Sequence, residues 1–214
     1  MKERSSSQII RVDGKNVFVE VVSSSFTIQK VQMNFIEYNE QTKKQTTRID
    51  IFVDMWSALA LAERIINGEF FRMVNKAKNE NSFEGKVISA YTSYFSNMGG
   101  LSEPRVEEKF ETLKKQHPFL EKGMALSRQF KIQVGNKMPW VLRAECGIGK
   151  CSESGLIMPQ GASKQCVNIP VDTDSLIKIA IAIKYSCNAY LNQYYAKYAD
   201  KLFPKDTVRT YTPQ

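Results

Sequence analysis

The stretch Ile51-Phe52-Val53-Asp54-Met55-Trp56-Ser57 returns 118 residues later as Ile169-Pro170-Val171-Asp172-Thr173-Asp174-Ser175. In both copies apolar residues alternate up to a Val-Asp pair, and the period then changes from that of a strand to that of a helix. An aspartate at this place is a typical helix N-cap. Each stretch therefore predicts a strand that runs directly into a capped helix.

Four runs of alternating residues lead up to the first junction. They are Gln8–Val12, Asn16–Val22, Lys30–Tyr38 and Thr46–Val53. Turn signals separate them, namely Asp13-Gly14, a serine cluster at 23–25 and a polar tip at 39–45. The helix after Val53 ends at Asn67-Gly68, a C-cap pair. The sequence thus predicts a meander of four antiparallel strands followed by one helix, a unit spanning residues 8–68.

The second junction closes a similar series. Its predicted strands are Phe130–Val134, Pro139–Cys146, Gly155–Met158 and Gln165–Val171, and a longer helix follows from about Thr173 to Ala199. Chance similarity of two apolar junctions is the alternative, but the shared order of elements favours an internal duplication with a second unit at 130–199. Leu176–Ile183 has almost no polar side, so we expect this helix to be buried all round, against the first helix or another subunit.

The segment between the units, residues 70–129, repeats neither of them. Within it, Glu103–Glu121 is predicted as a helix that begins after Ser102, and Gly99-Gly100 as a flexible break. Three further predictions are a mobile loop at Asn75–Ser82, helix or strand at Phe83–Phe95, and a tail at 200–214. The fold class is therefore α+β: a tandem pair of four-stranded antiparallel sheets, each followed by a helix, with a partly helical insert, in one domain over residues 1–214.

The charge of the chain is unevenly distributed. Thirty Lys and Arg stand against 22 Asp and Glu, a net charge of +8. Residues 1–69 contain nine of each sign, whereas residues 129–214 contain eleven basic and six acidic residues. A basic C-terminal half favours a polyanionic partner, nucleic acid first and an anionic membrane second.

Two tandem units of four antiparallel strands and a helix resemble the whirly proteins, which look like a fused pair of the single unit of the positive cofactor four family of transcriptional coactivators. The resemblance covers residues 8–68 and 130–199 and rests on the order and size of the elements. The Lys-Gly-Lys signature of plant whirly proteins is absent from this sequence. The resemblance implies binding of single-stranded nucleic acid along the sheets, by an oligomer assembled through the helices.

Alternation assigns the side chains of each strand to two faces, one buried and one open to a ligand. The open faces are predicted to carry a mixture of cations, amides and aromatic rings, which suits single strands because cations contact phosphates and rings stack on bases. Ordinary solvated strand faces are the alternative. The predicted nucleic-acid-binding residues are Lys30, Gln32, Asn34, Tyr38, Arg48, Phe52, Lys131, Gln133, Arg143 and Lys150. The last lies in Gly147–Ser152, which is similar to a phosphate-binding loop but has Ala144 and Cys151 at two required positions, so we interpret it as a hairpin turn.

The sequence contains no recognisable catalytic constellation. The single histidine, His117, ends a charged helix before Pro118, where we expect it to be exposed to solvent. Four cysteines without a secretory signal predict free thiols in the cytoplasm, and the spacing of Cys146 and Cys151 does not fit a zinc site. We therefore expect a non-enzymatic protein without metal or cofactor.

Three classes of function remain. The first is a single-stranded nucleic-acid-binding protein, for DNA before RNA and with weak sequence preference, that acts in DNA replication, transfer, repair or transcription as a homo-oligomer. The second is an oligomeric structural or protein-interaction module of a phage or mobile element. The third is a nucleotide-handling enzyme whose site the motifs do not reveal.

Overall fold

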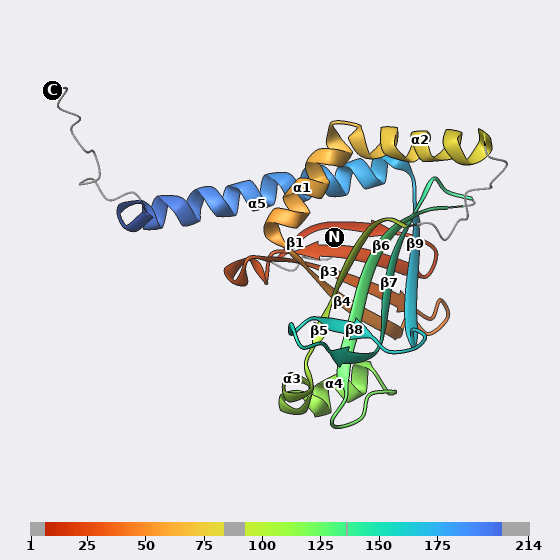
Figure 1. The fold of residues 1–214 in the computed structure, drawn as a ribbon, viewed down its shortest axis with the longest axis vertical. Helices are drawn as coiled ribbons and strands as arrows, with labels where there is room; N and C mark the ends of the chain where they lie inside the picture. The colour runs from red at the N-terminus through yellow and green to blue at the C-terminus, as the bar shows by residue number, and fades with distance from the viewer. Residues whose placement is uncertain (1–6, 84–92, 136, 203–214) are drawn as a thin grey trace.

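The computed structural model describes the backbone of residues 7–83, 93–135 and 137–202. Its elements are β1 (Gln8–Asp13), β2 (Val17–Val22), the 3-10 turn η1 (Phe26–Ile28), β3 (Lys30–Tyr38), β4 (Gln45–Asp54), α1 (Met55–Ile66), α2 (Glu69–Phe83), β5 (Ser93–Leu101), α3 (Glu103–Glu108), α4 (Phe110–Gln116), β6 (Ala125–Val134), β7 (Trp140–Cys151), β8 (Ile157–Pro159), β9 (Gln165–Val171) and α5 (Thr173–Leu202). The fold is α+β with two antiparallel sheets (Figure 1).

The first sheet, sheet A, is the predicted four-stranded meander in the order β1-β2-β3-β4. Its register pairs Val19 with Phe35 and Phe35 with Ile49, so that the apolar side chains of successive strands share one face. These side chains are buried, which confirms the face assignment made from alternation. The helix predicted to end at Asn67-Gly68 is also confirmed, since α1 ends at Ile66.

The second sheet, sheet B, has five strands in place of the four predicted. β6 pairs with β5 on one side and β7 on the other, and β7 pairs with both β8 and β9 along different parts of its length. The additional strand, β5, comes from the insert and contains Gly99 and Gly100, so the predicted flexible break is wrong. The predicted hairpin turn at Gly147–Ser152 is wrong as well, because β7 continues to Cys151 and the turn follows at Ser152–Leu156.

The insert differs from its prediction in two helical parts. Asn75–Ser82 lies in helix α2, where we predicted a loop, and the predicted helix Glu103–Glu121 is divided into the short helices α3 and α4. Most of Phe83–Phe95, and the predicted tail from residue 203 onward, lie outside the described residues.

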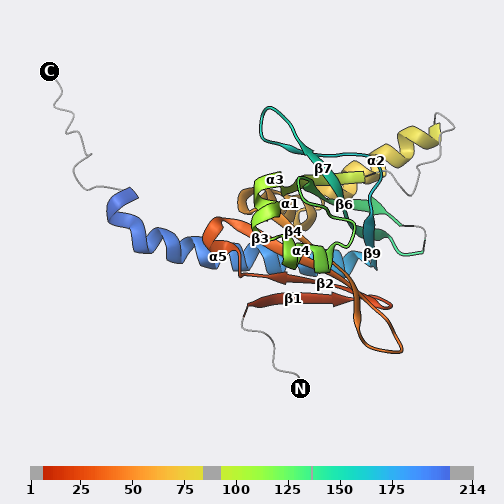
Figure 2. The ribbon, with the colours of Figure 1, turned by 90° about the horizontal axis from the view of Figure 1, so that it is seen from below.

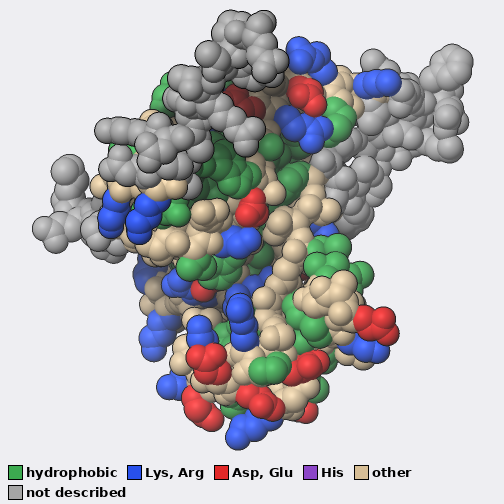
Figure 3. Space-filling model, turned by 60° about the vertical axis from the view of Figure 1, so that its left-hand side comes forward, with side chains coloured by type: hydrophobic (Ala, Val, Ile, Leu, Met, Phe, Trp, Pro, Cys, Tyr) green, Lys and Arg blue, Asp and Glu red, His purple; other side chains and the backbone are tan. Residues whose placement is uncertain are grey.

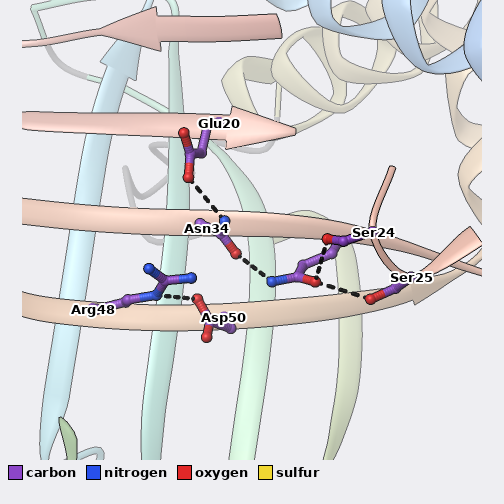
Figure 4. Close-up of polar contacts among 7 residues, drawn as sticks. Glu20, Ser24, Ser25, Asn34, Arg48 and Asp50 are labelled. Carbon is purple, nitrogen blue, oxygen red and sulfur yellow. Dashed lines mark hydrogen bonds and ion pairs between the residues drawn. The ribbon is translucent and has the colours of Figure 1, made fainter. Parts of the chain in front are cut away.

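The two sheets pack with their apolar faces toward each other, and their strands cross (Figures 1 and 4). Phe35 of sheet A meets Phe130 of sheet B at a ring-centre distance of 5.6 Å. Helices α1 and α5 pack on each other and contribute to the same apolar cluster. A cavity of about 20 Å³ is lined by side chains of both sheets and both helices, so one core joins the two units.

Both repeated junctions have the predicted capped form. The Asp54 carboxylate accepts hydrogen bonds from the backbone N–H groups of Trp56 and Ser57, at 3.0 and 3.2 Å. The Asp172 carboxylate accepts one from Ser175, at 2.6 Å. A short acidic side chain satisfies N–H donors that the first helical turn leaves unpaired. The local sequence therefore determines where each strand becomes a helix.

Helix α5 runs past the sheets, and its C-terminal part projects from the body of the molecule (Figures 1 and 2). Leu176 and Ile183 are buried, but Ile181 is 39% exposed and Tyr185 is 69% exposed. The prediction that this helix is buried on all sides is therefore wrong for the side that carries Ile181 and Tyr185. Within the described part of the chain, no helix is long and apolar enough to span a membrane.

Candidate nucleic-acid interface

The outer face of sheet A is the face that points away from the core. Strand register arranges its side chains in rows, for example Glu20, Asn34 and Asp50 across β2, β3 and β4. Six of the ten sequence-predicted residues lie on this face: Lys30, Gln32, Asn34, Tyr38, Arg48 and Phe52.

A chain of hydrogen bonds follows the middle of this face (Figure 4). Ser25 Oγ donates to Gln32 Oε1 at 2.9 Å, Gln32 Nε2 donates to Asn34 Oδ1 at 2.8 Å, and Asn34 Nδ2 donates to Glu20 Oε1 at 2.9 Å. Asn34 is only 3% exposed. The expectation that it lies open to a ligand is therefore wrong, because its neighbours across the sheet cover it.

Three aromatic rings lie on the same outer face. Phe18 and Tyr38 pair with ring centres 6.2 Å apart, and Phe52 is 38% exposed. The guanidinium carbon of Arg11 lies 3.6 Å from the ring centre of Phe18, and that of Arg128 lies 5.9 Å from the ring centre of Phe52. A cation over a ring face stabilises the ring position and leaves the opposite face for another planar group.

Each cation of this face has a carboxylate beside it. Arg11 lies 2.5 Å from Asp13 and Arg48 lies 2.7 Å from Asp50, while Lys30 is 3.6 Å from Asp54. These pairs are partly exposed, and pairs of this kind contribute only about 0–1 kcal/mol. With Glu20 added, these strands present four acidic and three basic groups on this face, so it does not have the net positive charge that the sequence pattern indicates.

Three other predicted residues, Lys131, Gln133 and Arg143, lie on the outer face of sheet B. Lys131 Nζ and an Arg143 guanidinium nitrogen are each 2.5 Å from the carboxylate of Glu145. Gln133 is buried at 6% exposure, which corrects the expectation that it is open. The tenth residue, Lys150, is exposed near the far end of β7, where it pairs with Met158 of β8.

The predicted residues do not form one site. Because the sheets pack through their apolar faces, the outer faces point away from each other, with the aromatic rings on sheet A. Sequence reasoning assigned the faces correctly, but it could not show that the two sheets pack face to face.

A buried polar cluster lies at the end of sheet B, formed by His117, Cys146 and Gln165, and it was not predicted from the sequence. His117 is 1% exposed, so the predicted solvent exposure is wrong. Its Nδ1 lies 2.7 Å from Gln165 Oε1, which also accepts from the thiol of Cys146 at 3.1 Å. Among the described residues, His117 Nε2 and Arg128 Nε are buried without a hydrogen-bond partner.

The chemistry of this cluster is not that of a cysteine nucleophile. Burial raises the pKa of the Cys146 thiol to about 12, so the thiolate is not formed at neutral pH. Burial, together with the charge of Arg128, lowers the pKa of His117. All four cysteines are free thiols. Among residues 7–83, 93–135 and 137–202, no group of three or more His, Cys, Asp or Glu side chains could hold a metal ion.

The two cations that lie beside the rings of Phe18 and Phe52, Arg11 and Arg128, were absent from the predicted set. Arg11 was identifiable, because it alternates with apolar residues in β1 and so shares the outer face. Arg128 was not, because it lies on the apolar side of β6, between Leu126 and Phe130, and is 8% exposed. Only the packing of the sheets brings it to the edge of β4.

Comparisons with known proteins give no match: no protein-family model, no curated protein and no solved structure is significantly similar to this chain.

Proposed function

We propose that the chain binds single-stranded nucleic acid, DNA in the first place, across the outer face of sheet A, and that its two units form a whirly-like fold. The observation that carries the proposal is the set of three rings, Phe18, Tyr38 and Phe52, on one sheet face, with a cation beside two of them, Phe18 and Phe52. Base stacking on such rings contributes roughly 1–3 kcal/mol per base and tolerates any sequence.

The cations on the outer face of sheet A are paired with carboxylates in ways that still allow them to bind phosphates. The exposed pairs Arg11–Asp13 and Lys30–Asp54 are weak, so a phosphate can compete with their carboxylates for the two cations. The net charge of +8 attracts a polyanion from a distance. Such binding weakens as the salt concentration rises.

The hydrogen-bonded amides explain the weak sequence preference that we propose. Gln32 Oε1 and Asn34 Oδ1 already accept hydrogen bonds within the protein. Their amides therefore have few groups left for base edges, and stacking dominates over base readout. A protein of this kind serves DNA replication, transfer, repair or transcription.

Fluorescence anisotropy with a labelled oligo-dT, short enough for one protein molecule, tests the proposal. Phe52→Ala removes one stacking ring and should weaken binding roughly 5- to 140-fold, from the stacking energy of one base. The control is Tyr185→Ala, which removes a 69% exposed ring from α5, away from the sheet face. Equal affinity of Phe52→Ala and wild type would refute the role of this face.

A second candidate function is an oligomeric structural or protein-interaction module of a phage or mobile element. Exposed apolar side chains on the helices favour it: Trp56 of α1 is 51% exposed, and Ile181 and Tyr185 of α5 are 39% and 69% exposed. Figure 3 shows hydrophobic side chains gathered above the charged lower end that bears α3 and α4. In this case light scattering should detect an oligomer that Ile181→Asp dissociates, and oligo-dT should not bind.

A further inference from the structure

The outer face of sheet B differs in charge from that of sheet A. The strands of sheet B contain one acidic residue, Glu145, whereas those of sheet A place four on the outer face: Asp13, Glu20, Asp50 and Asp54. Register places a polar row across four strands of sheet B, formed by Ser96, Lys131, Arg143 and Asn168.

The single acid of this face is covered by the two cations. The Glu145 side chain is 7% exposed, and the Lys131 and Arg143 side chains are 25% and 24% exposed. Burial opposes ionisation of Glu145, but the hydrogen bonds from Lys131 and Arg143 outweigh it and lower the pKa of this carboxyl. Solvent therefore meets the two cations, while the carboxylate beneath holds them in place.

The chemistry of this face suits a phosphate backbone without base stacking. Its described side chains include cations, amides and small polar groups, among them Gln129, Asn168 and Cys166, and no aromatic ring. Lys and Arg bind phosphates of duplex and single strand alike, with strong dependence on salt. Arg in addition offers a planar fork of donors that matches phosphate oxygens.

We propose that the outer face of sheet B is a second, independent site for a nucleic-acid backbone, and that one molecule holds two nucleic-acid segments on opposite sides. The first segment is the single strand on sheet A, so the bridging activity rests on the function proposed above. The second segment is recognised through phosphates alone, and a duplex therefore binds there as well as a single strand.

A capture experiment tests the bridging activity. Biotinylated oligo-dT on a surface is saturated with the protein, and a labelled duplex of unrelated sequence is then added. Wild type should capture the duplex. The variant Lys131→Gln/Arg143→Gln/Glu145→Gln keeps polar side chains but removes the three charges, and it should capture at least tenfold less duplex while the amount of protein held on the oligo-dT surface through sheet A stays the same. Lys178→Gln, an exposed position on α5, is the control for loss of charge elsewhere.

The single variant Glu145→Gln should change duplex binding in the opposite direction to the triple variant. A gain of binding cannot result from misfolding, so this variant is a control for a triple variant that fails to fold. Removing the neutralising acid should strengthen duplex binding and steepen its dependence on log salt by about 0.9. Duplex anisotropy with free protein measures this without any oligo-dT, so the second site is tested even if the first fails. Unchanged duplex capture by the triple variant, or duplex binding that Glu145→Gln leaves equal or weaker, would overturn the proposal.

Discussion

Replacing Phe130 by alanine should remove an aromatic contact that joins the two sheets. The ring is 2% exposed and lies 5.6 Å from the ring centre of Phe35 in sheet A and 5.8 Å from that of Phe95 in β5. A buried Phe→Ala change costs about 3–5 kcal/mol, through lost burial and the cavity left behind. With two ring pairs lost as well, we expect the free energy of unfolding to fall by about 4 kcal/mol.

Urea unfolding measures this loss. In a Trp56→Phe background the only remaining tryptophan is Trp140, which is buried in sheet B and reports on its unfolding. The matched control is Phe52→Ala, because this ring has the same size but is 38% exposed on the outer face, and its loss should cost less than about 1 kcal/mol. Equal losses for the two variants would show that Phe130 does not join the two sheets in one core.

Two further predictions concern stability. Burial lowers the pKa of His117 below that of the unfolded chain, so folding favours the neutral ring, and this contribution is complete above pH 6.5 and decreases as the pH falls below it. The melting temperature, measured between pH 5 and 8, should fall on the acid side, and it should fall less steeply in His117→Phe than in wild type. Identical slopes of melting temperature against pH in the two proteins would contradict this prediction. Gly100→Ala should cost about 1–3 kcal/mol, because its Cβ would clash with the backbone oxygen of Leu126, whereas Gly99→Ala has open space and should be tolerated in the same urea measurement.

The strands and helices of the two units could be predicted because their signals are local. Alternation, the two Val-Asp junctions and the caps at Asp54 and Asp172 lie within short stretches of sequence. The strand β5 could not be predicted, because Gly99 and Gly100 have no strand propensity of their own. Gly100 belongs there because only a residue without a Cβ fits against Leu126.

The candidate site was predictable only as a list of outward positions. Register confirms that Gln32, Asn34 and Phe52 share a face. The sequence could not show that Asn34 is covered, nor that Lys131 and Arg143 converge on one carboxylate, since both depend on contacts between strands. The buried His117 contacts Gln165, which is 48 residues away in the sequence, so its surroundings could not be predicted from local patterns either.

Ultraviolet cross-linking of oligo-dT to the wild-type protein, with the cross-linked peptides identified by mass spectrometry, tests directly whether single strands bind across the outer face of sheet A. If single strands bind to this face, salt-sensitive cross-links should form to the rings of Phe18, Tyr38 and Phe52 on sheet A. Absence of cross-links at low salt, or cross-links confined to the tyrosines of α5, such as Tyr185 and Tyr195, would contradict it.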